Sequence, residues 1–161
     1  MKAFFAFCLC LFSFTTFAEN KVTLFVELSP AGSFQAVSQK AKGNILKAGD
    51  VVTADKISVS IESFKTGIEL RDEHTWKHMN STKHPKAILT DVKGQGGKAT
   101  GTLEVNGVKK PISINYKVVG QEINAKFTVK ASDFAMAKAV YLGVGVNDVI
   151  NVEVNHEYKN K

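Results

Sequence analysis

Polar and apolar residues alternate with a period of two along most of this chain. In residues 21–28 the alternation is carried by Val22, Leu24, Val26 and Leu28. Because successive side chains of a β-strand point to opposite faces, this alternation predicts strands with one apolar and one polar face. Such strands are typical of antiparallel sheets that bury one face. The predicted strands span 21–28, 34–45, 56–63, 86–93, 98–105, 108–119, 122–130 and 149–158.

Strands of this number and pattern predict an all-β domain, either a sandwich or a closed barrel. Asn106-Gly107 is the strongest hairpin signal, because both residues tolerate the positive φ of a type I′ turn. Closure removes the edges through which sheets pair with other chains, so we favour an eight-stranded antiparallel barrel. Such a barrel leaves room for side chains or one small ligand. The residues predicted to line its lumen are Ile114, Tyr116, Ile123, Ala125, Phe127 and Val129.

Residues 1–18 have the pattern of a secretory signal peptide. Met1-Lys2 is a short basic start, residues 3–14 are apolar but too few to cross a bilayer, and Thr16-Phe17-Ala18 offers small residues for cleavage. We expect cleavage after Ala18 and a single domain over 19–161 of an exported protein. Cys8 and Cys10 leave with the signal peptide, so the mature chain cannot form a disulfide. A retained membrane anchor is the alternative interpretation.

The composition argues against nucleic-acid binding and catalysis. The formal net charge is +6 at pH 7, but the basic residues form no single run interleaved with aromatic residues. The chain has no G-x-S-x-G motif, no plausible pair of catalytic carboxylates and, after cleavage, no cysteine. Residues 94–98, G-Q-G-G-K, superficially resemble a phosphate loop, but no helix follows, so a hairpin turn is the better interpretation. We expect a protein that is not an enzyme and has no cofactor.

Residues 66–85 interrupt the alternation and predict a short helical insert after the third strand. They contain the only arginine, the only tryptophan and three of the four histidines. Thr66 and Glu69 fit a capping box, so Thr66 is expected to be structural. Functional sites tend to lie on connections held by a rigid scaffold, so function is expected here. The residues expected at the mouth of the barrel are Arg71, His74, Trp76 and His78.

One carboxylate of this insert falls on its apolar face. Asp72 follows Ile68 by four residues and precedes Trp76 by four, so the three side chains share one side of the helix. A carboxylate buried on that side must be paired or hydrogen-bonded, so Asp72 is predicted to be structural. Its candidate partners are Arg71 and Lys65.

Two histidines of the insert could bind a metal ion. His74 and His78 lie four residues apart, on one helix face, and zinc or copper would suit their imidazoles. The spacing alone is a weak signal, and no acidic third ligand is obvious, because Asp72 points elsewhere. We predict histidines that line the mouth and no bound metal. A periplasmic metal- or redox-accessory protein that uses His74 and His78 is the alternative function.

Several motifs of the chain resemble those of the YceI-like family. They are T-G-I-x-L-R-D-x-H after a strand, K-H-P-K-A at the start of the next one, G-x-L-x-V-N-G-V-K-K-P-I around a hairpin, and the closing S-D-F and Y-L-G-V-G-V-N-D-V-I. The similarity runs over essentially the whole chain after the signal peptide, with the motifs in the family order. It implies an exported bacterial protein with a lipocalin-like barrel that holds a long amphiphile, typically a polyisoprenoid, in its lumen.

The resemblance completes the functional expectation. The protein is expected to be a periplasmic lipid-binding protein that stores or transports an isoprenoid or similar lipid, as a monomer or homodimer. The apolar tail would fill the lumen, and the polar head would lie at a mouth near the helical insert. An inner-membrane protein is a candidate partner, and no nucleic acid is expected.

Overall fold

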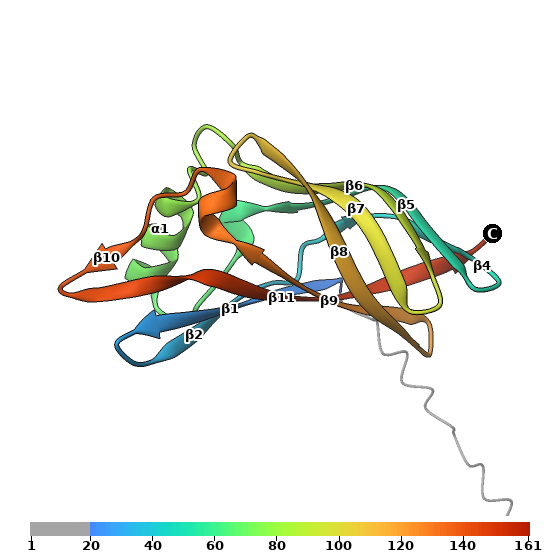
Figure 1. Ribbon diagram of the computed structural model, residues 1–161, viewed down its shortest axis with the longest axis horizontal. Coiled ribbons are helices and arrows are strands. Elements are labelled where there is room, and N and C mark those ends of the chain that lie inside the picture. Colours follow the sequence, from blue (N-terminus) through green and yellow to red (C-terminus); the bar gives the residue numbers. More distant parts are fainter. Residues whose placement is uncertain (1–19) are drawn as a thin grey trace, which may run out of the picture.

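The strands form a closed barrel with further strands beside it (Figure 1). The computed structural model describes residues 20–161, and the predicted signal peptide, residues 1–18, lies outside them. The ring is β11–β4–β5–β6–β7–β8–β9, and it closes because β9 pairs with β11. The strands are β1 (Lys21–Ser29), β2 (Ser33–Ser38), β3 (Lys42–Gly43), β4 (Ile45–Ala48), β5 (Val51–Ser60), β6 (Lys86–Gln95), β7 (Lys98–Val105), β8 (Val108–Val119), β9 (Glu122–Lys130), β10 (Val140–Tyr141) and β11 (Val144–Asn160).

The predicted all-β barrel is confirmed, but the predicted count of eight strands is wrong. Seven strands close the barrel. Outside this ring, β1 and β2 extend the sheet from β11, β3 pairs with β5, and β10 pairs with β11. Among the described pairings, all are antiparallel except that between β4 and the last residues of β11, which is parallel.

The single strand predicted over 34–45 is wrong, because the chain changes partner within it. β2 pairs with β1 as far as Ser38, and β3 then pairs with β5. The residues between Ser38 and Lys42 carry the chain from β1 to β5. Gly43 has a φ of +141°, and a Cβ atom there would collide with the carbonyl oxygen of Lys56. Only glycine allows this approach, so it fixes where the chain joins β5.

The C-terminal part is more regular than its sequence indicates. Residues 131–148, which lie between the predicted strands 122–130 and 149–158, contain a short 3-10 helix, η2 (Ala131–Phe134), then β10 and the beginning of β11. β11 is 17 residues long and starts before the predicted strand 149–158. Its length serves several partners, since it pairs with β10, β1, β9 and β4.

The predicted tight turns are present. Asn106 and Gly107 have φ values of +51° and +74°, as a type I′ turn between β7 and β8 requires. The glycine-rich segment 94–98 is a hairpin turn between β6 and β7, with Gly96 and Gly97 at its tip. This agrees with the interpretation that it is not a phosphate loop.

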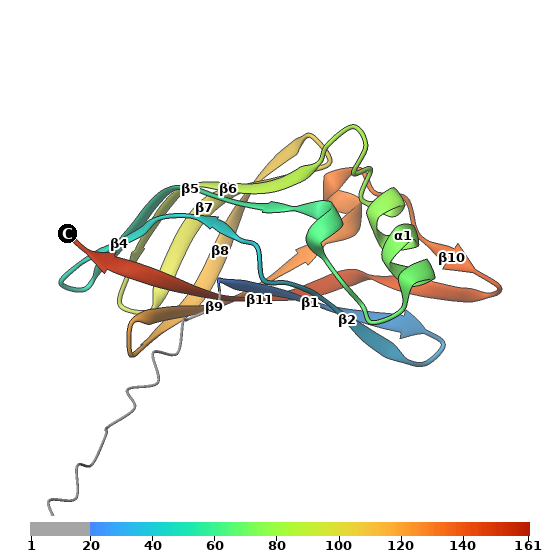
Figure 2. The same cartoon turned by 180° about the vertical axis from the view of Figure 1, so that it is seen from behind.

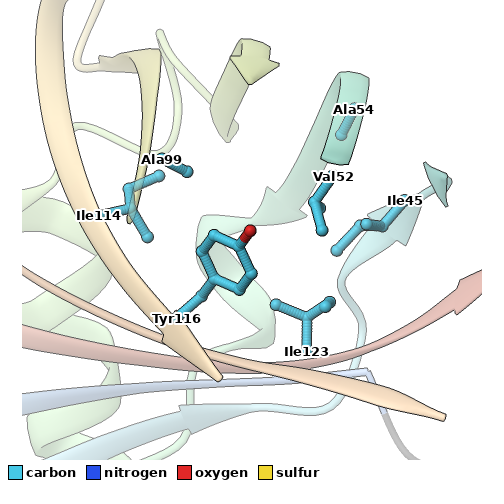
Figure 3. Packing of buried hydrophobic residues seen from close by; sticks show 7 residues of the cluster. All are labelled: Ile45, Val52, Ala54, Ala99, Ile114, Tyr116 and Ile123. Carbon is cyan, nitrogen blue, oxygen red and sulfur yellow. The ribbon is translucent and has the colours of Figure 1, made fainter. Parts of the chain in front are cut away.

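The inward side chains of the barrel form a continuous apolar interior. At one end, buried residues from five strands pack together, with the ring of Tyr116 among them (Figure 3). Phe127 also packs against the two clusters nearer the other end, so the interior has no polar layer that divides it. The members of the first cluster are Ile45, Val52, Ala54, Ala99, Ile114, Tyr116 and Ile123.

The helical insert lies at the end of the barrel away from the C-terminus (Figures 1 and 2). α1 (Glu69–His78) lies within the predicted insert 66–85, whereas a 3-10 helix, η1 (Ile61–Ser63), takes the place of the end of the predicted strand 56–63. Two hydrogen bonds between the backbones of Val37 and Lys65 tie the segment before α1 to β2. Among residues 20–161, no helix combines the length and apolarity needed to cross a bilayer.

Candidate functional site

The barrel contains an apolar cavity of about 870 Å³. Inward-facing residues of most strands line it, because the alternation of each strand places every second side chain inside. The described residues that line it include no Asp or Glu. All six residues predicted to face the lumen do so, and they are Ile114, Tyr116, Ile123, Ala125, Phe127 and Val129.

The deep end of the cavity carries a histidine that the sequence-based prediction missed. His156 lines the cavity and is only 2% exposed. Its Nδ1 lies 2.7 Å from the carbonyl oxygen of Glu157, so Nδ1 is the donor of this hydrogen bond. Nε2 is buried and has no hydrogen-bond partner among the described residues. The alternation of Val152 and Val154, continued by two residues, identifies position 156 as inward.

The helix α1 contributes most of the polar lining at the mouth of the cavity. Arg71, His74 and His78 line the cavity there, as predicted, and so does Lys77, which the prediction omitted. The backbone hydrogen bonds between Lys65 and Val37 fix the segment before α1 to β2, and α1 lies at this end of the barrel (Figure 2).

The prediction that Trp76 lies at the mouth is wrong, because its side chain does not line the cavity. Its indole Nε1 donates to the carbonyl oxygen of Phe64 at 2.9 Å, and the Lys65 ammonium lies 4.1 Å from the ring centroid. The tryptophan sits on the helix face that packs toward the preceding loop, four residues after Asp72. Its position indicates an anchor for α1 rather than a contact with a ligand.

Two contacts hold Arg71 at the cavity wall. Its Nη2 donates to the carbonyl oxygen of Thr66 at 3.0 Å, and its guanidinium carbon lies 4.7 Å from the ring centroid of Phe34. Stacking on an aromatic face suits the planar guanidinium. Nε is buried and lacks a hydrogen-bond partner in the part of the chain that the structure describes. Arg71 is therefore a fixed positive charge with donor capacity to spare.

Asp72 is buried, as predicted, at 5% exposure. It accepts hydrogen bonds from the backbone amide of Thr66 at 2.6 Å and from the Thr66 hydroxyl at 2.7 Å. The Lys65 ammonium lies 3.6 Å from its other oxygen, so Lys65 is its charged partner and Arg71 is not. Burial alone raises the pKa of this carboxyl, but the Thr66 bonds and the Lys65 charge outweigh burial, and the pKa lies below its usual value.

The predicted capping box is wrong. Ile68 occupies the position before α1, and no side chain caps the helix. The Thr66 hydroxyl bonds to Asp72 and to the Ile68 carbonyl oxygen, because Thr66 lies too far before the helix start to reach its first amides. Ile68 is also 53% exposed, so the buried face of the helix does not extend to it.

The two helix histidines differ in environment. His78 is half-buried, and burial lowers the pKa of its imidazole, whereas His74 is exposed. Within residues 20–161, no three His, Cys, Asp or Glu side chains come together as they would to hold a metal ion.

Known structures with the same architecture span most of this chain. BcnA of Burkholderia cenocepacia superposes with a TM-score of 0.67 at 14% identity, over 84% of this chain and 94% of that one. A polyisoprenoid binding domain from Saccharophagus degradans gives a TM-score of 0.64 at 16% identity, over 88% of this chain and 96% of that one. At these identities the likeness shows the fold alone.

Sequence comparison identifies the family. A UPF0312 protein of Pectobacterium carotovorum is 34% identical over 100 residues, which are 51% of this chain and 52% of that protein. The chain thus matches about half the length of this curated relative. The model of the YceI-like domain matches residues 14–158. Since that match covers nearly all of the barrel, the chain belongs to the YceI-like domain family.

Proposed function

We propose that this protein is a periplasmic, non-catalytic binding protein for one long-chain amphiphile, a polyisoprenoid or a similar lipid, which it stores or transports. The observation that carries the proposal is the apolar cavity of about 870 Å³ inside the barrel. Its volume is in the range of ligand sites, about 300–1,000 Å³. The likeness to the polyisoprenoid binding domain of Saccharophagus degradans supports the ligand class.

Burial of the apolar tail supplies the binding free energy. Each methylene removed from water contributes about 0.8 kcal/mol, so about ten buried carbons contribute roughly 8 kcal/mol. This is enough to offset the loss of freedom of the ligand and to leave useful affinity. The tail would contact the predicted lumen residues, among which Ala125 leaves the most space because it is the smallest.

The polar head of the amphiphile would lie at the mouth. Arg71, Lys77 and His74 line the cavity there and offer donors and positive charge. Phosphate or carboxylate groups pair well with guanidinium, and the buried Nε of Arg71 has no other partner among residues 20–161. An anionic or strongly polar head is therefore the one that this mouth suits.

Export follows from the pattern of residues 1–18. Cleavage after Ala18 would release a protein that begins at Glu19 and contains no cysteine. N-terminal sequencing of material from the periplasm tests this, and a chain that still began at Met1 would contradict it. An inner-membrane protein is the proposed source or recipient of the lipid, and the oligomeric state is proposed as monomer or homodimer.

Organic extraction of the purified protein tests the proposed function directly. We expect mass spectrometry to find one long-chain lipid per chain. Elemental analysis of the same sample addresses the metal-accessory alternative. A sample with a stoichiometric metal and no lipid would overturn the proposal.

A substitution inside the lumen tests whether the lipid binds there. Ala125 lines the cavity between Tyr116 of β8 and Val154 of β11, so Ala125→Trp fills the space that the tail needs. Thr128→Trp is the matched control, since Thr128 lies on the same strand and is exposed. We expect Ala125→Trp to lose lipid and Thr128→Trp to keep it. If folded Ala125→Trp carries as much lipid as the parent, the lumen is not the site.

A further inference from the structure

Large apolar side chains surround the mouth of the cavity and remain exposed to solvent. We call these residues the apolar rim, and they come from two segments, the start of α1 and the β10–β11 hairpin. Each lines the cavity, yet 40–85% of each residue is exposed. Both segments lie at the same end of the barrel in both views (Figures 1 and 2). The apolar rim consists of Ile68, Leu70, Val140, Leu142 and Val144.

Leu142 is the most exposed of these side chains, at 85%. It lies in the tight turn between β10 and β11, with a φ of +48°. A polar turn residue such as asparagine would suit both that backbone conformation and the exposure. A leucine in this position gains nothing for folding. Its exposed apolar surface is therefore expected to contact another molecule.

The charge beside the rim is positive on the cavity side. Among the described residues, the Arg and Lys side chains that line the cavity are Arg71 and Lys77, and no carboxylate lines it with them, because Glu69 and Glu73 of α1 lie exposed outside the lining. The long stem of a lysine can lie along apolar material while its ammonium reaches polar headgroups. Exposed apolar tips with basic residues behind them are typical of surfaces that sit in the interface of an anionic bilayer.

We propose that the apolar rim docks on an anionic phospholipid bilayer, with Leu70 and Leu142 inserted among the acyl chains. This inference rests on the proposed function and adds the route by which the ligand enters. The rim residues belong to the surface and to the cavity wall at once. A lipid that leaves the bilayer through the rim stays in contact with apolar side chains, and its tail does not cross water, which opposes the exposure of each methylene.

Vesicle flotation tests the docking separately from ligand binding. The protein without its signal peptide is mixed with phosphatidylcholine vesicles that contain or lack phosphatidylglycerol. We expect it to float with the anionic vesicles and to bind the neutral ones less. The double variant Leu70→Glu, Leu142→Glu should bind anionic vesicles at least about tenfold more weakly, since two inserted leucines become charged.

Val119→Glu is the matched control. Val119 is 62% exposed, as much as the rim residues, but it lies at the β8–β9 turn at the other end of the barrel (Figure 1). Its variant should bind vesicles as the parent does. Equal loss in both variants, or no flotation of the parent, overturns the docking proposal. So does a parent dimer that the rim variant dissociates, with no vesicle binding, because the rim would then cover a second copy of the chain.

A second readout separates this proposal from the proposed function. A fluorescent long-chain lipid is offered either in donor vesicles or on cyclodextrin. Because the rim residues also line the cavity, the rim variant is compared with the parent for each source, and we expect its loading from vesicles to slow by a larger factor than its loading from cyclodextrin. An equal change in rate for both sources would sink the docking route and leave the lipid-binding function intact. No loading of the parent from either source would sink the lipid-binding function, while flotation still decides whether the rim docks.

Discussion

Asp72 fastens α1 to the loop before it. The carboxylate accepts two hydrogen bonds from Thr66, one from its amide and one from its hydroxyl, and is almost fully buried. Asp72→Ala leaves the Thr66 amide without its acceptor and leaves the Thr66 hydroxyl with only the Ile68 carbonyl oxygen, and hydrogen bonds to a charged group contribute about 1.5–3 kcal/mol each. We expect the free energy of unfolding to fall by about 2–4 kcal/mol, measured by urea denaturation.

Glu73→Ala is the control for the Asp72 variant. It removes the same charge from the next position of the helix, but Glu73 is exposed. Its stability should change by no more than about 0.5 kcal/mol. Equal changes in the two variants would show that Asp72 acts through its charge alone and that its hydrogen bonds contribute nothing.

The same carboxylate predicts a pH dependence. Because the folded-state pKa of Asp72 lies below its ordinary value of 3.8, its stabilisation is complete above that value and is lost as the pH falls through the folded pKa. The difference in unfolding free energy between the parent and Asp72→Asn should stay constant from neutral pH to about pH 5 and shrink below about pH 4. A difference that grew on acidification would contradict this.

Single residues of the site were predictable where a period determines them. The helical period identified Asp72 as buried and the strand period identified Ala125 as inward. Partners were less predictable, because Thr66 can cap a helix or bond a carboxylate, and the choice depends on where α1 begins. The same strand period could have identified His156 as inward. It was overlooked because a polar side chain is expected on the outer face of a strand.

At the scale of elements, the alternation predicted the strands well, but it predicted poorly where a strand ends and the chain changes its pairing partner. Residues 122–130 form β9 with the predicted bounds. Residues 34–45 form three strands, because a change of partner at Gly43 depends on an approach to Lys56 that lies outside the local sequence. The beginning of β11 was missed for a similar reason, since its pairing with β10 and β1 comes from distant segments.

The packing of β6 against β7 and β8 depends on Gly94, which is required for lack of space and not for a positive φ. A Cβ atom at Gly94 would lie 2.8 Å from Ala99 Cβ and 2.8 Å from Tyr116 Cε1. Gly94→Ala therefore forces these strands apart, and overpacking of this kind costs about 1–3 kcal/mol. We expect a lower urea midpoint at an unchanged m-value.

Gly145→Ala serves as the comparison within the same sheet. The nearest atom to a Cβ there is Lys138 Cε at 3.5 Å, an ordinary contact at the end of a flexible side chain. This variant should match the parent within about 0.5 kcal/mol. Similar losses for both variants would place the cost in the strand backbone and not in the contact with Tyr116.

At the scale of the whole molecule, closure produces the cavity. The strand period gave the inward residues, but it could not choose between a sandwich, whose inner faces touch, and a barrel, whose inner faces enclose space. The pairing of β9 with β11 settles this, and it joins residues that local patterns do not relate. The apolar rim was equally hidden, since its two segments lie far apart in the sequence and meet only once the barrel forms.

Ligand binding and stability are linked through this cavity. A lipid that binds the folded barrel and not the unfolded chain stabilises the protein by about 2.7 kcal/mol when its free concentration is 100 times its Kd. Delipidated protein should therefore melt several degrees lower than the loaded protein and recover when the lipid is returned. Ala125→Trp should show no recovery, because its lumen is filled, whereas Thr128→Trp should recover like the parent. Calorimetry of the three proteins with and without lipid measures this, and an equal rise in Ala125→Trp would place the lipid outside the barrel.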